Sequence, residues 1–358
     1  MFKRKRPLFS VIISCYNSGN YLGYLLSTLT AQGIRKDELE VIISDDCSSI
    51  KYDEVLDKFR DKLNIKVIVA DHNWGYPGHT REQGVSIATG EWITFADHDD
   101  GFFDNALKRL KKYIKKEHPE YAMYTEAWLG DSKTKKPARK NTVFGITHGE
   151  FFNLDNFWKK YDLHYSEKIK FNEDLYINNK ITHIIQRENL KMDKVDIPTY
   201  CWMVSNKESL GALARVDSNG KFHIETSFKD YIKTTFELYC DDYIANKDTY
   251  NIVEFMDDQI KYIFIVYAYM QSMYCMNREA GIEMDQNNYI YAAKAIKKFK
   301  DIAFLTTDQI IDTINKDYFG QTMNFSYQFV GPFYPIEGFP DWMKKLESLE
   351  DAELEEEV

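Results

Sequence analysis

The stretch Trp92-Ile93-Thr94-Phe95-Ala96, followed directly by Asp97-His98-Asp99-Asp100, decides how the rest of the chain is interpreted. Its first five residues favour β structure and predict a short buried strand. Three carboxylates follow where that strand ends, and like charges this close repel one another unless a cation lies among them. Carboxylate oxygens suit Mg²⁺ or Mn²⁺, which commonly link protein acids to substrate phosphates. The alternative is an acidic turn that caps a helix starting near Asp104.

Composition excludes several classes of protein. The 358 residues allow one large domain or two ordinary ones. The formal net charge of -10 argues against nonspecific nucleic-acid binding, although much of it lies in the tail from Glu347 to Glu357. Five scattered cysteines form no Cys-x-x-Cys pair, so we expect reduced thiols rather than disulfides or a zinc site.

We expect a cytoplasmic protein without a membrane span. The start of the sequence does not have the pattern of a secretory signal, and the longest apolar stretch, Tyr262 to Met270, is too short to cross a bilayer. The basic residues between Met1 and Pro7 allow peripheral contact with an anionic inner membrane surface.

Strand and helix patterns alternate through the first part of the chain. Strands are predicted at residues 9–14, 40–44, 65–70 and 92–96, and helices at 21–32, 53–63 and 79–89. This alternation predicts an α/β fold with a mostly parallel sheet flanked by helices. Polar or acidic loops end all four strands at one edge, where open α/β sheets bind nucleotides. The sequence contains neither Gly-x-Gly-x-x-Gly after the first strand nor a Gly-Lys-Ser/Thr loop, which disfavours a dehydrogenase and a P-loop NTPase.

Four motifs in order carry a resemblance to a known family. They are Ser10-Val-Ile-Ile-Ser-Cys-Tyr-Asn17, Val41-Ile-Ile-Ser-Asp-Asp-Cys-Ser48, Asn73-x-Gly75 with Arg81, and Ala88-x-Gly90-x-x-Ile93-x-Phe95-x-Asp97-x-Asp99-Asp100. Together they resemble the inverting family-2 glycosyltransferases of bacteria and phages, which have the GT-A (Rossmann-like) fold. The resemblance covers roughly Leu8 to Glu126. Glu82 replaces the family's common Asn and Cys47 its common Gly, and neither change removes a charged catalytic group.

The resemblance implies roles for the loops after the first two strands. Tyr16, with Asn17 beside it, would stack on the base of a UDP-sugar. Asp46, or less favourably Asp45, would accept the imide N–H of uracil, as a carboxylate is able to do. Arg81 would be the arginine on the diphosphate side. The alternatives are that the two acids cap the next helix and that Arg81 forms a surface salt bridge.

The resemblance also assigns the acids. Asp97 would contact the ribose and metal-bound water, and Asp99 would bind the Mn²⁺ or Mg²⁺ ion directly, while Asp100 shapes the loop and His98 is a spacer. Glu173 and Asp174 open an amphipathic helix, and Asp174 would be the general base for the acceptor hydroxyl, with Glu173 as its neighbour. Acids also favour the first turn of any helix, and a base must reach its hydroxyl.

The remaining sequence is less specific. Residues 131–141 are expected to form a basic loop with little strand, and Thr147 to Phe152 is a candidate edge for the acceptor. A strand at Val195 to Tyr200 precedes a loop whose Ser205, Lys207 and Ser209 are candidates for phosphate contacts. Trp202 either lines the acceptor side or packs in the core.

We therefore predict a GT-A catalytic domain at residues 1–209, a C-terminal α-helical region at 210–345 and an acidic tail at 346–358. The helical region would bind the acceptor, a partner or another copy of the chain. The predicted activity is metal-dependent inverting transfer from a UDP-sugar to a hydroxyl of a glycan, a cell-wall or capsule polymer, or a glycoprotein. The alternative is a non-catalytic nucleotide-sugar-binding or scaffold subunit of the same fold, and a glycoside hydrolase is less favoured.

Overall fold

The computed structural model describes residues 6–19, 21–131, 133–140, 148–165, 173–204, 214–216 and 222–224. The chain divides into two compact units, Met1–Asn206 and Lys207–Val358, and each is treated by itself below.

Four parallel strands form the first half of the large sheet in the first unit. They are β1 (Phe9–Cys15), β2 (Leu39–Asp45), β3 (Asn64–Val69) and β4 (Trp92–Asp97), in the order β3-β2-β1-β4. Every residue of β1 and β2 is buried, as expected for central strands with helices on both faces. The predicted α/β alternation is therefore confirmed in this half.

The second half of the sheet is mixed. β8 (Glu150–Asn153) pairs antiparallel with β4, and β6 (Ala122–Asp131) pairs antiparallel with β8. β9 (Met192–Val204) then runs parallel to β6, and the short β5 (Gly101–Phe102) pairs antiparallel with β9. The prediction of a mostly parallel sheet is thus confirmed, because β1 to β4, β6 and β9 all run in the same direction. β5 and β8 run in the opposite direction and make the second half mixed.

Two local predictions were wrong. Residues 131–141 are not a strand-poor loop, because β7 (Lys136–Lys140) pairs with the end of β6 in a hairpin. Charged residues and proline are typical of edge strands, so this strand does not have the apolar pattern of a buried one. The helix predicted at 53–63 is also shorter, since α2 (Asp53–Asp57) is followed by hydrogen-bonded turns up to Leu63.

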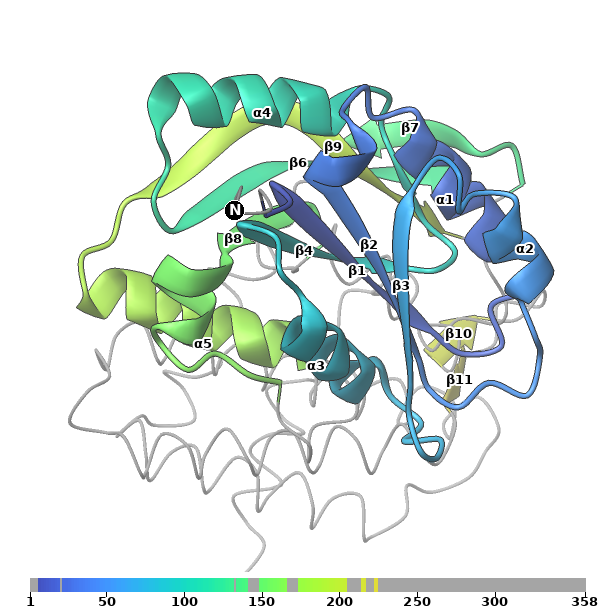
Figure 1. Ribbon diagram of the computed structural model, residues 1–358. Helices are drawn as coiled ribbons and strands as arrows, with labels where there is room; N and C mark the ends of the chain where they lie inside the picture. Colours follow the sequence, from blue (N-terminus) through green and yellow to red (C-terminus); the bar gives the residue numbers. More distant parts are fainter. Residues whose placement is uncertain are drawn as a thin grey trace, which may run out of the picture. The chain divides into compact units, whose positions relative to one another are not determined.

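Helices cover both faces of the sheet (Figure 1). On one face, α1 (Tyr21–Thr30), α2 and α4 (Ala106–Glu117) pack on alternate residues of the strands, such as Val11, Ile13 and Ile43. On the other, α3 (Pro77–Ile87), the π-helical segment η2 (Leu154–Lys159) and α5 (Glu173–Arg187) pack on Ile12, Ile42 and Phe95. The short 3₁₀ helix η1 (Lys36–Glu38) precedes β2. The two-residue period of the strands divides the apolar side chains between two cores.

A buried polar cluster fixes the edge of the sheet where β1 and β2 begin. The Glu40 carboxylate contacts Lys66 at 2.6 Å and accepts hydrogen bonds from the Ser10 hydroxyl at 2.6 Å and the Thr89 amide at 2.8 Å. Gly90 lies against Ser10 so closely that an added Cβ would be 2.5 Å from the serine oxygen and 2.6 Å from its backbone nitrogen. The turn that leads into β4 is therefore held tightly, and the opposite edge is left for the functional loops.

In the second unit, β10 (Ala214–Val216) and β11 (Phe222–Ile224) form an antiparallel pair. The first described element after residue 209 is thus a strand rather than a helix. Apart from these two strands, the C-terminal helical region predicted at 210–345 lies outside the described residues, as does the acidic tail at 346–358. Over the stretches that are described, no helix has the length and apolar character needed to cross a membrane.

Candidate active site

The loops after β1 and β2 hold each other at the carboxyl edge of the sheet. Asn17 adopts a positive φ of 47°, a conformation that Asn tolerates better than most residues. Its backbone N–H donates to the Ser48 hydroxyl at 2.8 Å, and its side-chain oxygen accepts from the amides of Ser49 and Ile50 at 3.0 and 3.1 Å. Tyr16 beside it is 48% exposed, so one face of its ring is open to solvent. Stacking of Tyr16 on a base stays a prediction.

Asp45 and Asp46 are both buried and bind loop backbone. The Asp46 carboxylate accepts hydrogen bonds from the amides of Trp74 and Gly75, each at 2.9 Å, and so fixes the loop that follows β3. Asp45 accepts from the amide and hydroxyl of Ser48. Neither acid caps α2, whose N-cap position is occupied by Tyr52. A uracil contact would therefore be made by a carboxylate already held in place.

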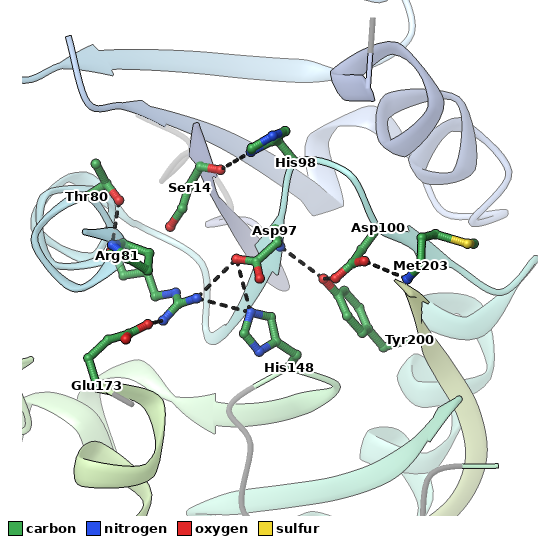
Figure 2. A network of polar contacts seen from close by, with 11 residues as sticks. Ser14, Thr80, Arg81, Asp97, His98, Asp100, His148, Glu173, Tyr200 and Met203 are labelled. Atoms are coloured by element: carbon green, nitrogen blue, oxygen red, sulfur yellow. Dashed lines mark hydrogen bonds and ion pairs between the residues drawn. The ribbon is translucent and has the colours of Figure 1, made fainter. Parts of the chain in front are cut away.

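Arg81 in α3 connects two acids that are far apart in the sequence (Figure 2). Its side chain is only 2% exposed, with Nη2 3.0 Å from Asp97 Oδ1 and Nη1 2.5 Å from Glu173 Oε1. The guanidinium carbon also lies 5.6 Å from the centre of the Tyr165 ring. Arg81 therefore forms a buried link, not a surface salt bridge, between the end of β4 and the first turn of α5. A contact from Arg81 to a diphosphate stays a prediction.

His148 completes this group from the start of β8. Its Nε2 lies 3.3 Å from Asp97 Oδ1 and 3.3 Å from Arg81 Nη2. Its ring packs near those of Tyr200 and Trp202, with centroid distances of 5.5 and 5.9 Å. Trp202 thus lies beside the site, and the predicted acceptor edge at Thr147 to Phe152 contributes His148 to it.

The local charges decide which acids are ionised. Burial raises the pKa of Asp97, but His148 and Arg81 lower it more, so its pKa lies well below the usual range. Burial raises the pKa of Glu173 to about 7, against the lowering effect of Arg81. Asp97 is therefore a carboxylate at neutral pH, while Glu173 titrates near neutrality.

Asp100 connects the acidic loop, residues 97–100, to β9. The Tyr200 hydroxyl donates to Asp100 Oδ2 at 2.6 Å and accepts the Asp97 amide at 3.0 Å, and the Met203 amide donates to Asp100 Oδ1 at 2.8 Å. His98 Nδ1 lies 3.2 Å from the Ser14 carbonyl oxygen, so its ring is directed towards β1 rather than towards Asp97 (Figure 2). Sequence reasoning missed Tyr200, because an aromatic residue in a strand is normally a core residue, and its hydroxyl partner is distant in sequence.

The residues present suit a divalent ion that is shared with a substrate. Asp97 has one oxygen occupied by Arg81 and His148, and its side chain is 38% exposed. Within the described ranges, no group of three His, Cys, Asp or Glu side chains has an arrangement that could hold a metal ion by itself, so an ion held by Asp97 and Asp99 would need further ligands. Mg²⁺ typically binds through one or two carboxylates together with substrate phosphates and water. Asp174 lies half-buried beside Glu173 in the first turn of α5, and Lys207 lies outside the described residues.

Comparisons with known proteins identify the family of the chain. The model of the family described as "Glycosyl transferase family 2" matches residues 10–195. The poly(ribitol-phosphate) beta-N-acetylglucosaminyltransferase TarS of Staphylococcus aureus is 38% identical over 112 residues, which are 31% of this chain and 20% of TarS. The minor teichoic acid biosynthesis protein GgaA of Bacillus subtilis is 30% identical over 193 residues, 49% of this chain and 43% of GgaA. The chain thus matches less than half of the length of either relative.

A solved structure supports the fold. S. aureus TarS 1-349 in complex with UDP-GlcNAc has a TM-score of 0.51 and 20% sequence identity, over 92% of this chain and 93% of that one. At this identity the likeness concerns the fold alone. Since the family model covers more than half of the sequence, the chain belongs to glycosyl transferase family 2, with the GT-A fold.

Proposed function

We propose that this chain transfers a sugar from a UDP-sugar to a hydroxyl group of a cell-wall polymer, with inversion at the anomeric carbon. The printed names of its relatives support this class of reaction, since TarS is named for transfer to poly(ribitol-phosphate) and GgaA for teichoic acid biosynthesis. The observation that carries the proposal is the Arg81 link. One guanidinium holds the acid at the end of β4 and the first turn of α5 at the same corner of the sheet.

Donor binding is assigned to the loops after β1, β2 and β3. The exposed Tyr16 ring would stack on uracil, and Asp46 would accept its imide N–H. Asn17 and Asp45 keep the two loops in register, which preorganises the base site and lowers the entropic cost of binding. Lys207 would contact the diphosphate.

Asp97 and Asp99 would hold Mg²⁺ or Mn²⁺ beside the diphosphate. When bound, the ion would neutralise charge that develops on the departing UDP. Arg81 and His148 both contact the same oxygen of Asp97, and this leaves its other oxygen for a ligand.

Proton removal from the acceptor is assigned to Asp174. Asp174 lies in the first turn of α5, directly after Glu173. The Glu173–Arg81 pair fixes that turn, so Asp174 keeps its direction when an acceptor approaches. A single in-line displacement by the activated hydroxyl gives inversion.

The test is release of UDP from a panel of UDP-sugars with Mn²⁺ or Mg²⁺, before and after chelation. We expect release to require the ion, and Asp174→Asn to lose turnover while UDP binding, measured by calorimetry, is kept. Asp57→Asn is the matched control, because Asp57 is an exposed acid that pairs only with neighbouring Arg60 in the described part of the chain. Normal sugar transfer by the Asp174 variant would contradict the base assignment. UDP binding without turnover on any donor would instead favour a non-catalytic nucleotide-sugar-binding subunit.

A further inference from the structure

A basic hairpin projects from the edge of the sheet. It comprises residues 131–140, the end of β6, a tight turn and β7 (Figure 1). It contains five basic residues and one acid in ten positions, in a chain whose formal net charge is -10. The basic residues are Lys133, Lys135, Lys136, Arg139 and Lys140. The hairpin is therefore positively charged, whereas the chain as a whole is negatively charged.

In the part of the hairpin that the structure describes, one lysine forms an ion pair with a carboxylate. Lys140 pairs with Glu126 at 2.5 Å. Among the described residues, Lys133, Lys135 and Lys136 form no ion pair, although the charge of Lys133 acts on the neighbouring Asp131. Three lysines opposed by one nearby acid therefore lie within four positions of the sequence.

Hydrogen bonds and ring contacts place this tip beside the candidate active site. Asp131 Oδ1 accepts the amides of Lys133 and Thr134 at 3.0 and 2.6 Å, which closes the turn. Lys135 Nζ lies 4.8 Å from the ring centre of Tyr24 and 5.8 Å from that of Tyr21. The Tyr21 ring lies in turn 6.4 Å from His98, in the acidic loop.

The strand register gives the same location independently. Gly130, just before the turn, pairs with Met203 of β9. The Met203 amide donates a hydrogen bond to Asp100, so Met203 contacts both the end of β6 and the acidic loop. The basic tip and the proposed metal-binding acids therefore lie at the same edge of the sheet.

We propose that the basic hairpin binds the phosphodiester backbone of a polyanionic acceptor and lays it beside the acidic loop. This rests on the proposed function and adds the class of acceptor and its docking surface. A polymer with repeated phosphates is repelled by an acidic protein unless local cations take up its charge, and binding to them releases counterions.

The side chains around the tip favour a polymer over a membrane surface. Amphipathic segments that insert into the membrane interface combine basic residues with exposed large apolar ones. The exposed large hydrophobic residues of the described chain are Tyr16, Ile50, Val67 and Val69, and none is in the hairpin.

The experiment measures binding of a poly(ribitol phosphate) chain by calorimetry across salt concentrations, without any UDP-sugar. Lys133→Gln/Lys135→Gln/Lys136→Gln should bind at least tenfold more weakly at low salt. The slope of log K against log[salt] should become shallower by about two to three, since each phosphate contact contributes about 0.9. The matched control is Lys108→Gln/Lys112→Gln/Lys115→Gln, which removes three exposed lysines of α4 and should bind as the unmodified protein does. Lys135→Arg keeps the charge and the ring contact and should also bind normally.

Three outcomes would overturn the proposal: unchanged binding by the hairpin variant, an equal loss in the α4 variant, or binding of the unmodified protein to anionic phospholipid vesicles but not to the polymer. If the triple variant fails to fold, Lys133→Gln alone should still reduce the slope by about one. Because no donor is present, a failure of the proposed transferase activity is seen separately, as absence of UDP release by a protein that still binds the polymer.

Discussion

The strongest test of the site concerns Arg81. In Arg81→Met, the apolar side chain fills much of the same space, but the buried Glu173 carboxyl loses its guanidinium partner, and Asp97 keeps His148 as its partner among the described residues. Removing one partner of a buried ion pair typically costs about 3–5 kcal/mol, because the other charge stays desolvated. The first turn of α5 should therefore detach from the sheet.

The magnitude gives a measurable effect on α5. Since every 1.4 kcal/mol is a factor of about ten, amide hydrogen exchange in residues 173–187 should become roughly a hundred to a few thousand times faster. Arg187→Met is the matched control, because Arg187 lies at the other end of α5 and pairs with Glu188 on the surface. An exposed pair of this kind contributes about 0–1 kcal/mol, so that variant should change exchange less than tenfold.

The same variant predicts a pH dependence. Burial already raises the pKa of Glu173 to about 7 with Arg81 present, and loss of the guanidinium raises it further. A group whose pKa is raised in the folded state stabilises that state below its unfolded value and loses this effect as pH rises through the folded pKa. The cost of Arg81→Met should therefore grow as pH rises above about 7, where Glu173 is ionised in the unmodified protein but still protonated in the variant. The double variant Arg81→Met/Glu173→Gln should recover most of the lost stability, because it has no buried carboxylate at position 173. Unchanged hydrogen exchange in α5 of Arg81→Met would refute the proposal that Arg81 holds this helix to the sheet.

Three further outcomes follow from the packing. Gly90→Ala should cost about 1–3 kcal/mol, because its Cβ would meet backbone at 2.6 Å, whereas Gly23→Ala in α1 has ordinary contacts and should be neutral or stabilising in denaturant titrations. Burial raises the pKa of Glu40, but its lysine and hydroxyl partners lower it more, so stability should be lost as pH falls below about 4.5, and Glu40→Gln should reduce that loss in acid unfolding. Tyr200→Phe should cost about 1–3 kcal/mol by leaving Asp100 without its hydroxyl donor, and exchange of the acidic-loop amides will show it.

The local pattern of the sequence was sufficient for the first half of the sheet. Alternating apolar runs and helical spacing predicted β1 to β4 with α1 and α3, and the polar ends of those strands predicted the edge where Asp97 lies. These features depend on neighbours within about ten residues. The resemblance to family-2 glycosyltransferases added the class, and the family model confirmed it. The roles of Asp97, Asp99 and Asp174 stay predictions.

The local sequence pattern did not predict which distant segments pair with each other. β7 is an edge strand whose lysines and proline give no apolar alternation, and β8 pairs with β4 although the paired residues Ile93 and Phe152 are 59 positions apart. The spacing of residues in the sequence also does not predict which acid will form an ion pair with a buried arginine. Arg81 pairs with Glu173, 92 residues away, only because α3 and α5 pack on the same face of the sheet.

The sequence by itself determined the α/β class, the order of the first strands and the acidic loop at the end of β4, because hydrophobic periodicity and turn residues act over short distances. Only the tertiary structure decided that Arg81, His148 and Glu173 surround that loop and that the basic hairpin lies beside it. Those contacts join polar atoms from distant segments, and their energy depends on burial that no local stretch of sequence encodes.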